Sequence, residues 1–287
     1  MKAPRFAYAR PASVAEALAL LAEHKGDARV LAGGQSLVPM MNFRVAAPKV
    51  LVDINRIAAL TGIKVTRNHL RIGALTRQVE LERSADIARH LPLIAAAMPH
   101  IAHPAIRNRG TFGGSCALAD PAAELPACAI ALGAIFVVAG KKSERRIAAE
   151  DFFKGLYATA LKAGELLVAA EFPLPKPGYA SAFGELARRH GDYAMVGVAA
   201  HGSTQGARFS DMRVVFFGVG DRPLRAAKFE RALDGQSVTA KTVDAALPKL
   251  DADLDPRADL HGTAATKLHL AKVLVGRVLA KMEGVVA

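Results

Sequence analysis

The sequence predicts an α+β protein built from three parts. Residues 1–56 carry a helical pattern followed by two short strand patterns, and residues 57–177 carry two hairpin patterns. Residues 178–287 follow a proline-rich segment and begin with three short, closely spaced strand patterns. Short strands joined by polar turns pair as antiparallel neighbours, which favours an antiparallel sheet in the last part.

The first part begins with a helix start signal. Ser13 precedes an apolar pattern at 14, 17, 18, 20 and 21, and Glu16 stands where a capping box places an acid. Gly26 is a plausible stop for this helix. The segments 29–32 and 50–54 then read as strands.

The middle part alternates hairpins with helical stretches. Its first hairpin turns at the polar residues 67–69, and its second turns at 140–143. In chain order we expect a hairpin at 63–66 and 70–73, a helix at 85–97 ended by Pro99, a glycine-rich loop at 107–120, a helix from Pro121 to 132, and a hairpin at 134–139 and 145–148.

Three prolines mark the start of the last part. Pro173, Pro175 and Pro177 cannot continue a helix or an inner strand, so we place a domain boundary there. Beyond it we expect strands at 180–189, 193–203 and 211–219 and helices at 224–233, 240–249 and 259–283. Leu270, Leu274 and Val278 form the apolar face of the last helix, which predicts a core position.

The charge of the chain does not indicate nucleic-acid binding. The 287 residues have a formal net charge of +12, but the basic residues are scattered, and there is no Trp and only four Tyr to stack on bases. A basic surface, or one that faces an acidic partner subunit, explains the charge better. With an apolar fraction of 52%, the chain is globular.

Cysteine usage and hydropathy point to a cytoplasmic protein. The two cysteines, Cys116 and Cys128, form no CxxC pair, which disfavours an iron–sulfur cluster or structural zinc held by this chain alone, and both read as buried small hydrophobes. The N-terminus has no apolar signal region, and the longest uncharged run, 125–140, is shorter than a membrane span. His100 and His103 flank prolines, so no metal site is expected there.

Two glycine pairs are the strongest functional signal. The first, Gly33-Gly34, follows the strand pattern at 29–32 within the segment Ala32-Gly33-Gly34-Gln35-Ser36-Leu37. The second, Gly113-Gly114, lies between Thr111 and Ser115. Glycine-rich turns present backbone N–H groups that hold phosphate oxygens, and the hydroxyl groups add donors. Two such segments on different parts of the chain can converge on one extended ligand.

Other nucleotide and catalytic motifs are missing. The chain has no GxGxxG after a strand, no GxxxxGK[ST] and no GxSxG, so a dinucleotide fold of the Rossmann type, a P-loop and a nucleophile elbow are unsupported.

The roles of four residues stay open when only the sequence is considered. Asp120 can bind a ligand or cap the helix expected from Pro121, Tyr193 can be a core aromatic, and Arg107 and Arg109 can hold phosphate or form salt bridges.

The exact flanking residues give the two glycine pairs a family resemblance. AGGQSL, followed by RNRGTFGGSCALADPAAELPA and then by RRHGDYA at 188–194, resembles the FAD-binding medium subunit of the molybdenum hydroxylases, which include carbon monoxide dehydrogenase and xanthine dehydrogenase-like enzymes. The resemblance covers the whole chain. It implies a two-part FAD-binding module of the vanillyl-alcohol-oxidase type, followed by a C-terminal α+β domain.

The resemblance also implies roles for particular residues. The two glycine segments are expected to wrap the FAD pyrophosphate. Asp120 is expected to bind on the adenosine or ribitol side of the FAD, with Glu124 supporting it. Tyr193 is expected to lie near the isoalloxazine ring, and the main chain of 162–167 is expected to contact the flavin at Leu167. The expected cofactor-binding set is Ala32, Gly33, Gly34, Gln35, Ser36, Leu37, Thr111, Phe112, Gly113, Gly114, Ser115, Asp120, Glu124, Leu167 and Tyr193. Two residues depart from the family pattern. Ser115 stands where many relatives have Asn. Gln35 replaces a His of carbon monoxide dehydrogenases, which weakens an assignment of carbon monoxide as the substrate of the holoenzyme.

The resemblance implies an electron relay with no general base on this chain. Electrons are expected to arrive from two [2Fe–2S] clusters on a small subunit, which receive them from a molybdenum cofactor on a large subunit, within a dimer of heterotrimers. The acceptor can be NAD, a quinone, a cytochrome or oxygen. Two other readings compete: a self-contained FAD-dependent oxidoreductase of the same flavin fold, disfavoured by the GDYA segment, and a flavin-free scaffold, disfavoured by the intact glycine pairs.

Overall fold

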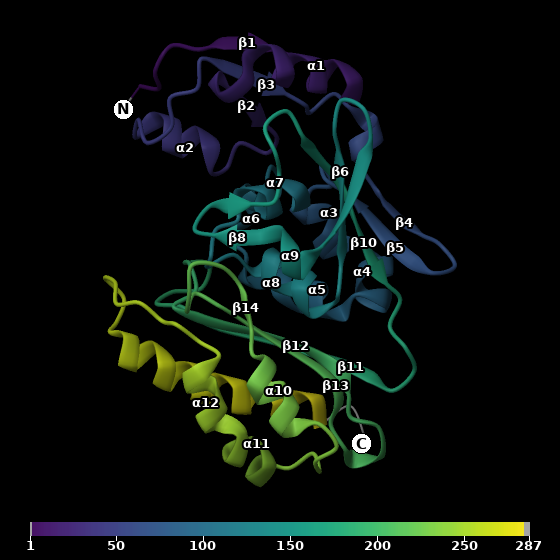
Figure 1. Cartoon of the computed structure of the whole chain (residues 1–287), viewed down its shortest axis with the longest axis vertical. Coiled ribbons are helices and arrows are strands. Elements are labelled where there is room, and N and C mark those ends of the chain that lie inside the picture. Colours follow the sequence, from purple (N-terminus) through teal and green to yellow (C-terminus); the bar gives the residue numbers. More distant parts are fainter. Residues whose placement is uncertain (1, 284–287) are drawn as a thin grey trace.

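The computed structural model describes residues 2–283, which form an α+β protein with three principal sheets stacked along the long axis (Figure 1). The N-terminal sheet is parallel, with strand order β1-β3-β2. Ser13 caps α1 by accepting a hydrogen bond from the Glu16 N–H, as the capping signal predicts. The elements of this part are β1 (Ala7–Ala9), α1 (Val14–His24), β2 (Ala28–Leu31), α2 (Leu37–Asn42) and β3 (Val50–Asp53).

The middle sheet is antiparallel, with strand order β4-β5-β10-β6-β7. Both predicted hairpins are present, and β10 joins them at the centre. The strands are β4 (Ile63–Val65), β5 (His69–Gly73), β6 (Ile135–Ala139), β7 (Glu144–Ala148) and β10 (Leu166–Pro173), with a small separate hairpin of β8 (Phe153–Gly155) and β9 (Ala158–Thr159).

Helices cover one face of this sheet. They are α3 (Gln78–Arg83), α4 (Ala85–His90), α5 (Pro92–Ala97), α6 (Pro104–Arg107), α7 (Phe112–Leu118), α8 (Glu124–Ala131) and α9 (Ala149–Phe152). The largest core lies between these helices and the sheet, where Phe112, Phe136 and Phe172 are fully buried. The opposite face packs on the N-terminal part, since Val137 and Val168 share a core with Leu18 and Leu21 of α1.

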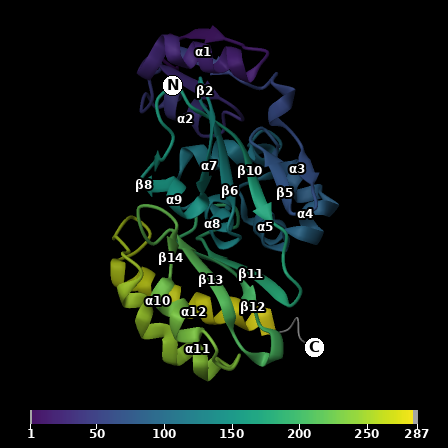
Figure 2. The same cartoon turned by 45° about the vertical axis from the view of Figure 1, so that its right-hand side comes forward.

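The C-terminal sheet is antiparallel, with strand order β11-β12-β13-β14, which confirms the predicted class (Figure 2). One face packs on α5 and α8 through Phe183 and Phe217, and α12 crosses the other face, where Leu274 and Val278 are buried. The elements are β11 (Tyr179–Leu186), β12 (Val196–Ser203), β13 (Ser210–Phe217), β14 (Leu224–Arg225), α10 (Ala227–Leu233), α11 (Ala240–Ala246) and α12 (Ala264–Glu283).

Three expectations about helices are wrong in detail. The helix expected over 85–97 is broken at Leu91, because Pro92 has no N–H to continue it and starts α5 instead. The helix expected from Pro121 begins at Glu124, and the glycine-rich loop expected over 107–120 contains the helix α7. Short 3₁₀ helices occupy Lys25–Asp27, Ala58–Leu60, Met98–His100, Gln205–Ala207 and Leu247–Ala252. Within residues 2–283, no helix is both long and apolar enough to cross a bilayer.

Candidate functional site

The first glycine segment is a turn between β2 and α2. Gly34 has a φ of +74°, a left-handed conformation that glycine adopts without strain, and the Gln35 side-chain amide donates to the Gly33 carbonyl at 2.9 Å. In the described part of the chain, none of the five backbone N–H groups from Gly33 to Leu37 donates a hydrogen bond. A run of uncommitted N–H groups in a tight turn forms a concavity suited to an anion.

The second glycine segment is helical rather than a loop. Thr111 is the N-cap of α7, and its Oγ1 accepts the Gly114 N–H at 3.0 Å. The N–H groups of Phe112 and Gly113 donate to the carbonyls of Thr76 and Ala74. A Cβ added at Gly113 would stand 2.5 Å from the Ala74 Cβ, so this glycine is required for close packing of α7 on the segment after β5.

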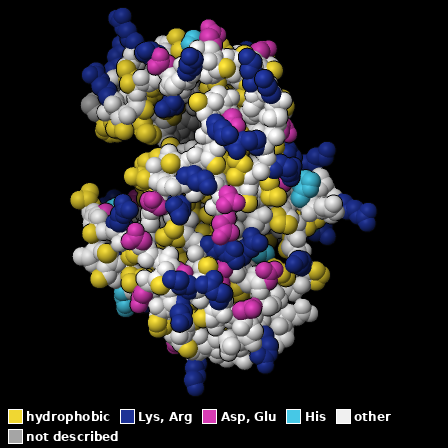
Figure 3. All heavy atoms as spheres, in the orientation of Figure 1, with side chains coloured by type: hydrophobic (Ala, Val, Ile, Leu, Met, Phe, Trp, Pro, Cys, Tyr) yellow, Lys and Arg dark blue, Asp and Glu magenta, His cyan; other side chains and the backbone are white. Residues whose placement is uncertain are grey.

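The structure brings the two glycine segments into contact. A Cβ added at Gly33 would lie 2.3 Å from the Arg109 carbonyl oxygen, and one added at Gly114 would lie 3.9 Å from the Ala32 Cβ. Figure 3 shows the surface hollowed between the N-terminal part near α2 and the middle part, with hydrophobic side chains on the α2 side. Val38 in α2, and Phe43 and Val45 after its end, are exposed hydrophobic residues.

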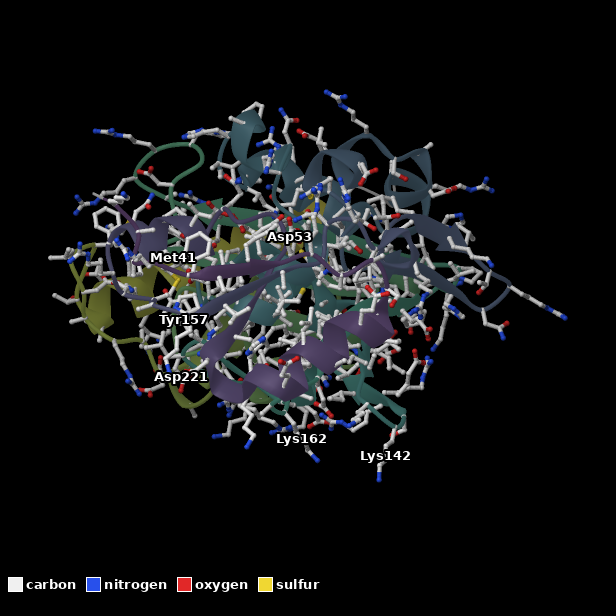
Figure 4. All side chains as sticks on the ribbon, turned by 90° about the horizontal axis from the view of Figure 1, so that it is seen from above. Met41, Asp53, Lys142, Tyr157, Lys162 and Asp221 are labelled. Atoms are coloured by element: carbon white, nitrogen blue, oxygen red, sulfur yellow. The ribbon has the colours of Figure 1, made fainter. Side chains whose placement is uncertain are left out.

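A polar network that sequence reasoning missed holds these segments together. The Asn55 amide donates to the Ala32 carbonyl at 2.8 Å, and its Oδ1 accepts from an Arg77 Nη2 at 2.7 Å. Arg77 also donates to the Arg109 carbonyl. Asp53, labelled in Figure 4, orients Asn55 by accepting its backbone and side-chain N–H groups. Asn55 and Arg77 stand outside the glycine motifs, so no local pattern marks them.

Replacing Asn55 with alanine is expected to weaken retention of a ligand on the first segment by about tenfold, because the loss of hydrogen bonds to charged and backbone groups costs on the order of 1–2 kcal/mol. Equilibrium titration of the chain with FAD measures the change. Asn68→Ala, at the exposed tip of the β4–β5 hairpin, is the matched control and should bind as the wild type does. Equal affinities for both variants would contradict the role given to Asn55.

Asp120 and two tyrosines lie at the edge of the middle part. Asp120 is 9% exposed, and its carboxylate accepts the Ala122 N–H at 2.9 Å and the Tyr157 hydroxyl at 3.4 Å. Because α8 starts at Glu124, Asp120 shapes the turn before the helix and does not cap it. Tyr157, at the tip of the β8–β9 hairpin, and Tyr193, between β11 and β12, are both largely exposed. Partial burial, followed by the charge of Asp120, raises the pKa of both tyrosine hydroxyls.

Glu124 and Glu185 are acids with raised pKa values. Burial, followed by the charge of Asp120, raises the pKa of Glu124 to about 7. Burial, followed by the charge of Glu124, raises the pKa of Glu185 to about 8. Among the described residues, Glu185 Oε2 is buried with no hydrogen-bond partner.

Glu124→Gln is expected to raise stability at pH 8 but not at pH 5. Since the folded-state pKa of about 7 exceeds the ordinary value of 4.5, the unfolded chain releases its proton first as pH rises. Wild-type stability therefore falls between about pH 4.5 and pH 7, by at most about 3 kcal/mol for this group, and stays lower above that window. Urea unfolding at both pH values tests this. Exposed Glu23→Gln should change little at either pH, and a Glu124→Gln effect independent of pH would contradict the assignment.

The remaining predicted residues have structural surroundings. Leu167 lies in β10 with its side chain in the main core, next to a register shift between Leu167 and Ala169 against β6. Ser36 precedes α2 without capping it through its side chain, and Ser115 is half-buried in α7. Arg107 is buried and pairs with Glu82 at 2.9 Å, which supports the salt-bridge reading.

The two cysteines and His100 have packed surroundings. Cys116 and Cys128 are buried as reduced thiols, and burial raises the pKa of both. His100 lies beside Phe183 and His190, with ring centroids 5.1 Å and 6.0 Å away. Within residues 2–283, no group of three or more histidine, cysteine or acidic side chains is arranged to hold a metal ion.

Comparison with known proteins identifies the class of protein. Residues 4–175 match the family described as FAD binding domain in molybdopterin dehydrogenase, and residues 181–282 match the CO dehydrogenase flavoprotein C-terminal domain. The fold and both matches define a flavoprotein component of molybdenum-dependent oxidoreductases. The chain belongs to the family of FAD-binding medium subunits found in carbon monoxide dehydrogenases and xanthine dehydrogenases.

Individual relatives align over nearly the whole chain. The carbon monoxide dehydrogenase medium chain of Hydrogenophaga pseudoflava is 40% identical, with 96% of each chain covered. The alpha subunit of the 6-hydroxypseudooxynicotine dehydrogenase complex of Paenarthrobacter nicotinovorans is 39% identical, covering 98% of this chain and 95% of the relative. A solved carbon monoxide dehydrogenase from Hydrogenophaga pseudoflava superposes with a TM-score of 0.97 at 40% identity, over 99% of each chain.

Proposed function

We propose that the two glycine segments hold the pyrophosphate of one FAD. The observation that carries this is the run of five uncommitted N–H groups from Gly33 to Leu37, which begins at Gly33 packed against Arg109 and Gly110. Thr111, Phe112, Gly113 and Ser115 are the proposed residues of the second segment, in which the N–H groups of Phe112 and Gly113 are engaged by Thr76 and Ala74. Ala32, Gly34, Gln35 and Ser36 are those of the first segment. Bound FAD supplies the redox chemistry, and this chain supplies binding and orientation.

The remaining proposed contacts place the flavin end of the ligand near the two tyrosines. Asp120 is positioned by Tyr157 and Ala122 to accept hydrogen bonds on the adenosine or ribitol side, with Glu124 behind it. Tyr193 is exposed and within electrostatic range of Asp120, which suits an aromatic that covers a ring. Leu167 is proposed to contact the flavin through its backbone. Its side chain lies in the core of the middle part, and the pairing of β10 with β6 shifts register between Leu167 and Ala169.

We further propose that the chain is the electron-transfer subunit of a cytoplasmic molybdenum hydroxylase. The names of its relatives support this, since they are medium chains or subunits of dehydrogenase complexes. On this proposal, [2Fe–2S] clusters of a small partner subunit deliver electrons to the FAD, a large subunit holds the molybdenum cofactor, and two heterotrimers pair. The division into 1–56, 57–177 and 178–287 is part of the same proposal.

Comparing FAD with FMN tests the pyrophosphate assignment directly. FMN has the same ring but a single phosphate and no adenosine, so only FAD engages both glycine segments. Fluorescence titration should give an affinity for FAD at least about tenfold above that for FMN, which corresponds to about 1.4 kcal/mol. Equal affinities would contradict the assignment of Gly33–Ser36 and Thr111–Ser115 to the pyrophosphate.

A separate experiment tests whether the FAD on this chain accepts electrons from the iron–sulfur partner subunit. Anaerobic mixing of the FAD-loaded chain with a reduced, desalted iron–sulfur partner subunit should bleach the flavin band near about 450 nm. The same chain mixed with the oxidised partner is the control and should keep its band. A flavin that stays oxidised beside the reduced partner would contradict the relay while leaving FAD binding intact.

A further inference from the structure

A second hollow lies away from the glycine segments, with a volume of about 580 Å³. It opens between the end of α1, the turn of the β6–β7 hairpin and the turn before β10. Its lining residues are Leu21, Ala22, Lys25, Gly140, Lys141, Lys142, Ser143, Arg145, Lys162, Ala163, Gly164 and Glu165. In Figure 4, Lys142 and Lys162 lie on the same edge of the molecule, away from Tyr157.

The lining of this hollow is strongly basic. It contains four lysines and Arg145 against one acid, Glu165. Both oxygens of Glu165 are already engaged: Arg145 donates to Oε1 at 2.8 Å and to Oε2 at 2.6 Å, and the Lys162 backbone N–H donates to Oε2 at 2.8 Å. The Arg145 hydrogen bonds lower the pKa of Glu165, so this carboxylate stays ionised and bound to the arginine.

The four lysines of the hollow have no acidic partner among the described residues, since no ion pair joins the ammonium group of Lys25, Lys141, Lys142 or Lys162 to a carboxylate there. They come from three separate elements, so the fold gathers them at one hollow although they are far apart in sequence. Like charges gathered without a counterion repel one another, and binding an anion relieves that repulsion.

The shape and chemistry of the hollow select the class of ligand. Its volume falls within the range of about 300–1,000 Å³ typical of small-molecule sites. Ammonium groups act as compact point charges suited to phosphate oxygens, and no aromatic side chain lines the hollow to stack on a base. We propose that the hollow binds a small, multiply charged anion of the phosphate-ester or polyphosphate class, recognised by its phosphates.

Calorimetric titration with inorganic pyrophosphate tests the site on the FAD-loaded chain, in which the glycine segments are filled. At a fixed ionic strength of 0.15 M, Lys142→Gln/Lys162→Gln should weaken pyrophosphate binding at least about tenfold. The matched control is Lys241→Gln/Lys249→Gln, which removes the same charge from exposed positions on the C-terminal helices and should bind as the wild type does. Thermal unfolding verifies that both variants fold.

Three results would overturn the proposal. One is no measurable pyrophosphate binding to the wild type at this ionic strength. Another is an equal loss in both double variants, which would show a response to net charge alone. The third is tight binding of hexaglutamate that pyrophosphate fails to displace, which would assign the hollow to an acidic segment of a partner protein.

Discussion

Replacing Gly33 with alanine is expected to leave the chain unable to retain FAD. The added Cβ would stand 2.3 Å from the Arg109 carbonyl oxygen and 2.9 Å from the Gly110 Cα, both of them backbone atoms that cannot rotate away. The first glycine segment must therefore move off the second. That movement separates the uncommitted N–H groups from Thr111 and Ser115 and pulls Ala32 from Asn55. We expect a loss of FAD affinity of at least about a hundredfold, or about 2.7 kcal/mol.

Gly26→Ala is the matched control for this change. No atom lies within 4 Å of a Cβ added there, and the residue stands in the short 3₁₀ turn after α1. FAD content after desalting and fluorescence titration should match the wild type. A Gly33→Ala protein that keeps full flavin occupancy would show that contact between the two segments is not needed for FAD binding.

Phe112→Ala is expected to lower the free energy of unfolding by about 3–5 kcal/mol, the usual cost of emptying a large buried aromatic site. Phe112 is fully buried, and its ring packs edge-on against Phe172 of β10 with centroids 5.9 Å apart. Within the proposed binding set, its side chain anchors the first turn of α7 in the core. The position of Gly113 and Gly114 depends on that anchor.

Urea unfolding in the absence of flavin measures the effect. Phe43→Ala is the matched control, because Phe43 follows α2 and is 68% exposed, and an exposed substitution of this kind changes stability by about 0.5 kcal/mol or less. A Phe112→Ala variant as stable as Phe43→Ala would contradict the anchoring role.

Patterns in the sequence predict the elements that carry a clear local signal. Alternating hairpins, the Ser13 cap and the proline-rich segment correspond to β4–β5, β6–β7, α1 and the connection between β10 and β11. The central strand β10 has no such signal, because seven of its eight residues are buried and alternation disappears when both faces are covered.

The structure of the candidate site was predictable only in part. The glycine pairs mark both segments, but the same glycines predict a loop where α7 forms, because glycine disfavours helix. Tertiary contacts override that preference, since Gly113 packs on Ala74 and the Thr111 cap receives Gly114. Asn55 and Arg77 come from other elements and meet the first segment only in the folded chain, so no spacing rule indicates them.

The visible absorption spectrum of the purified chain, recorded after incubation with FAD and desalting, tests FAD binding by this chain most directly. We expect flavin bands near about 370 and 450 nm, with about one FAD per chain, and loss of both bands in Gly33→Ala. A wild-type chain that stays colourless, both alone and when co-expressed with its partner subunits, would contradict the proposal that these glycine segments hold FAD.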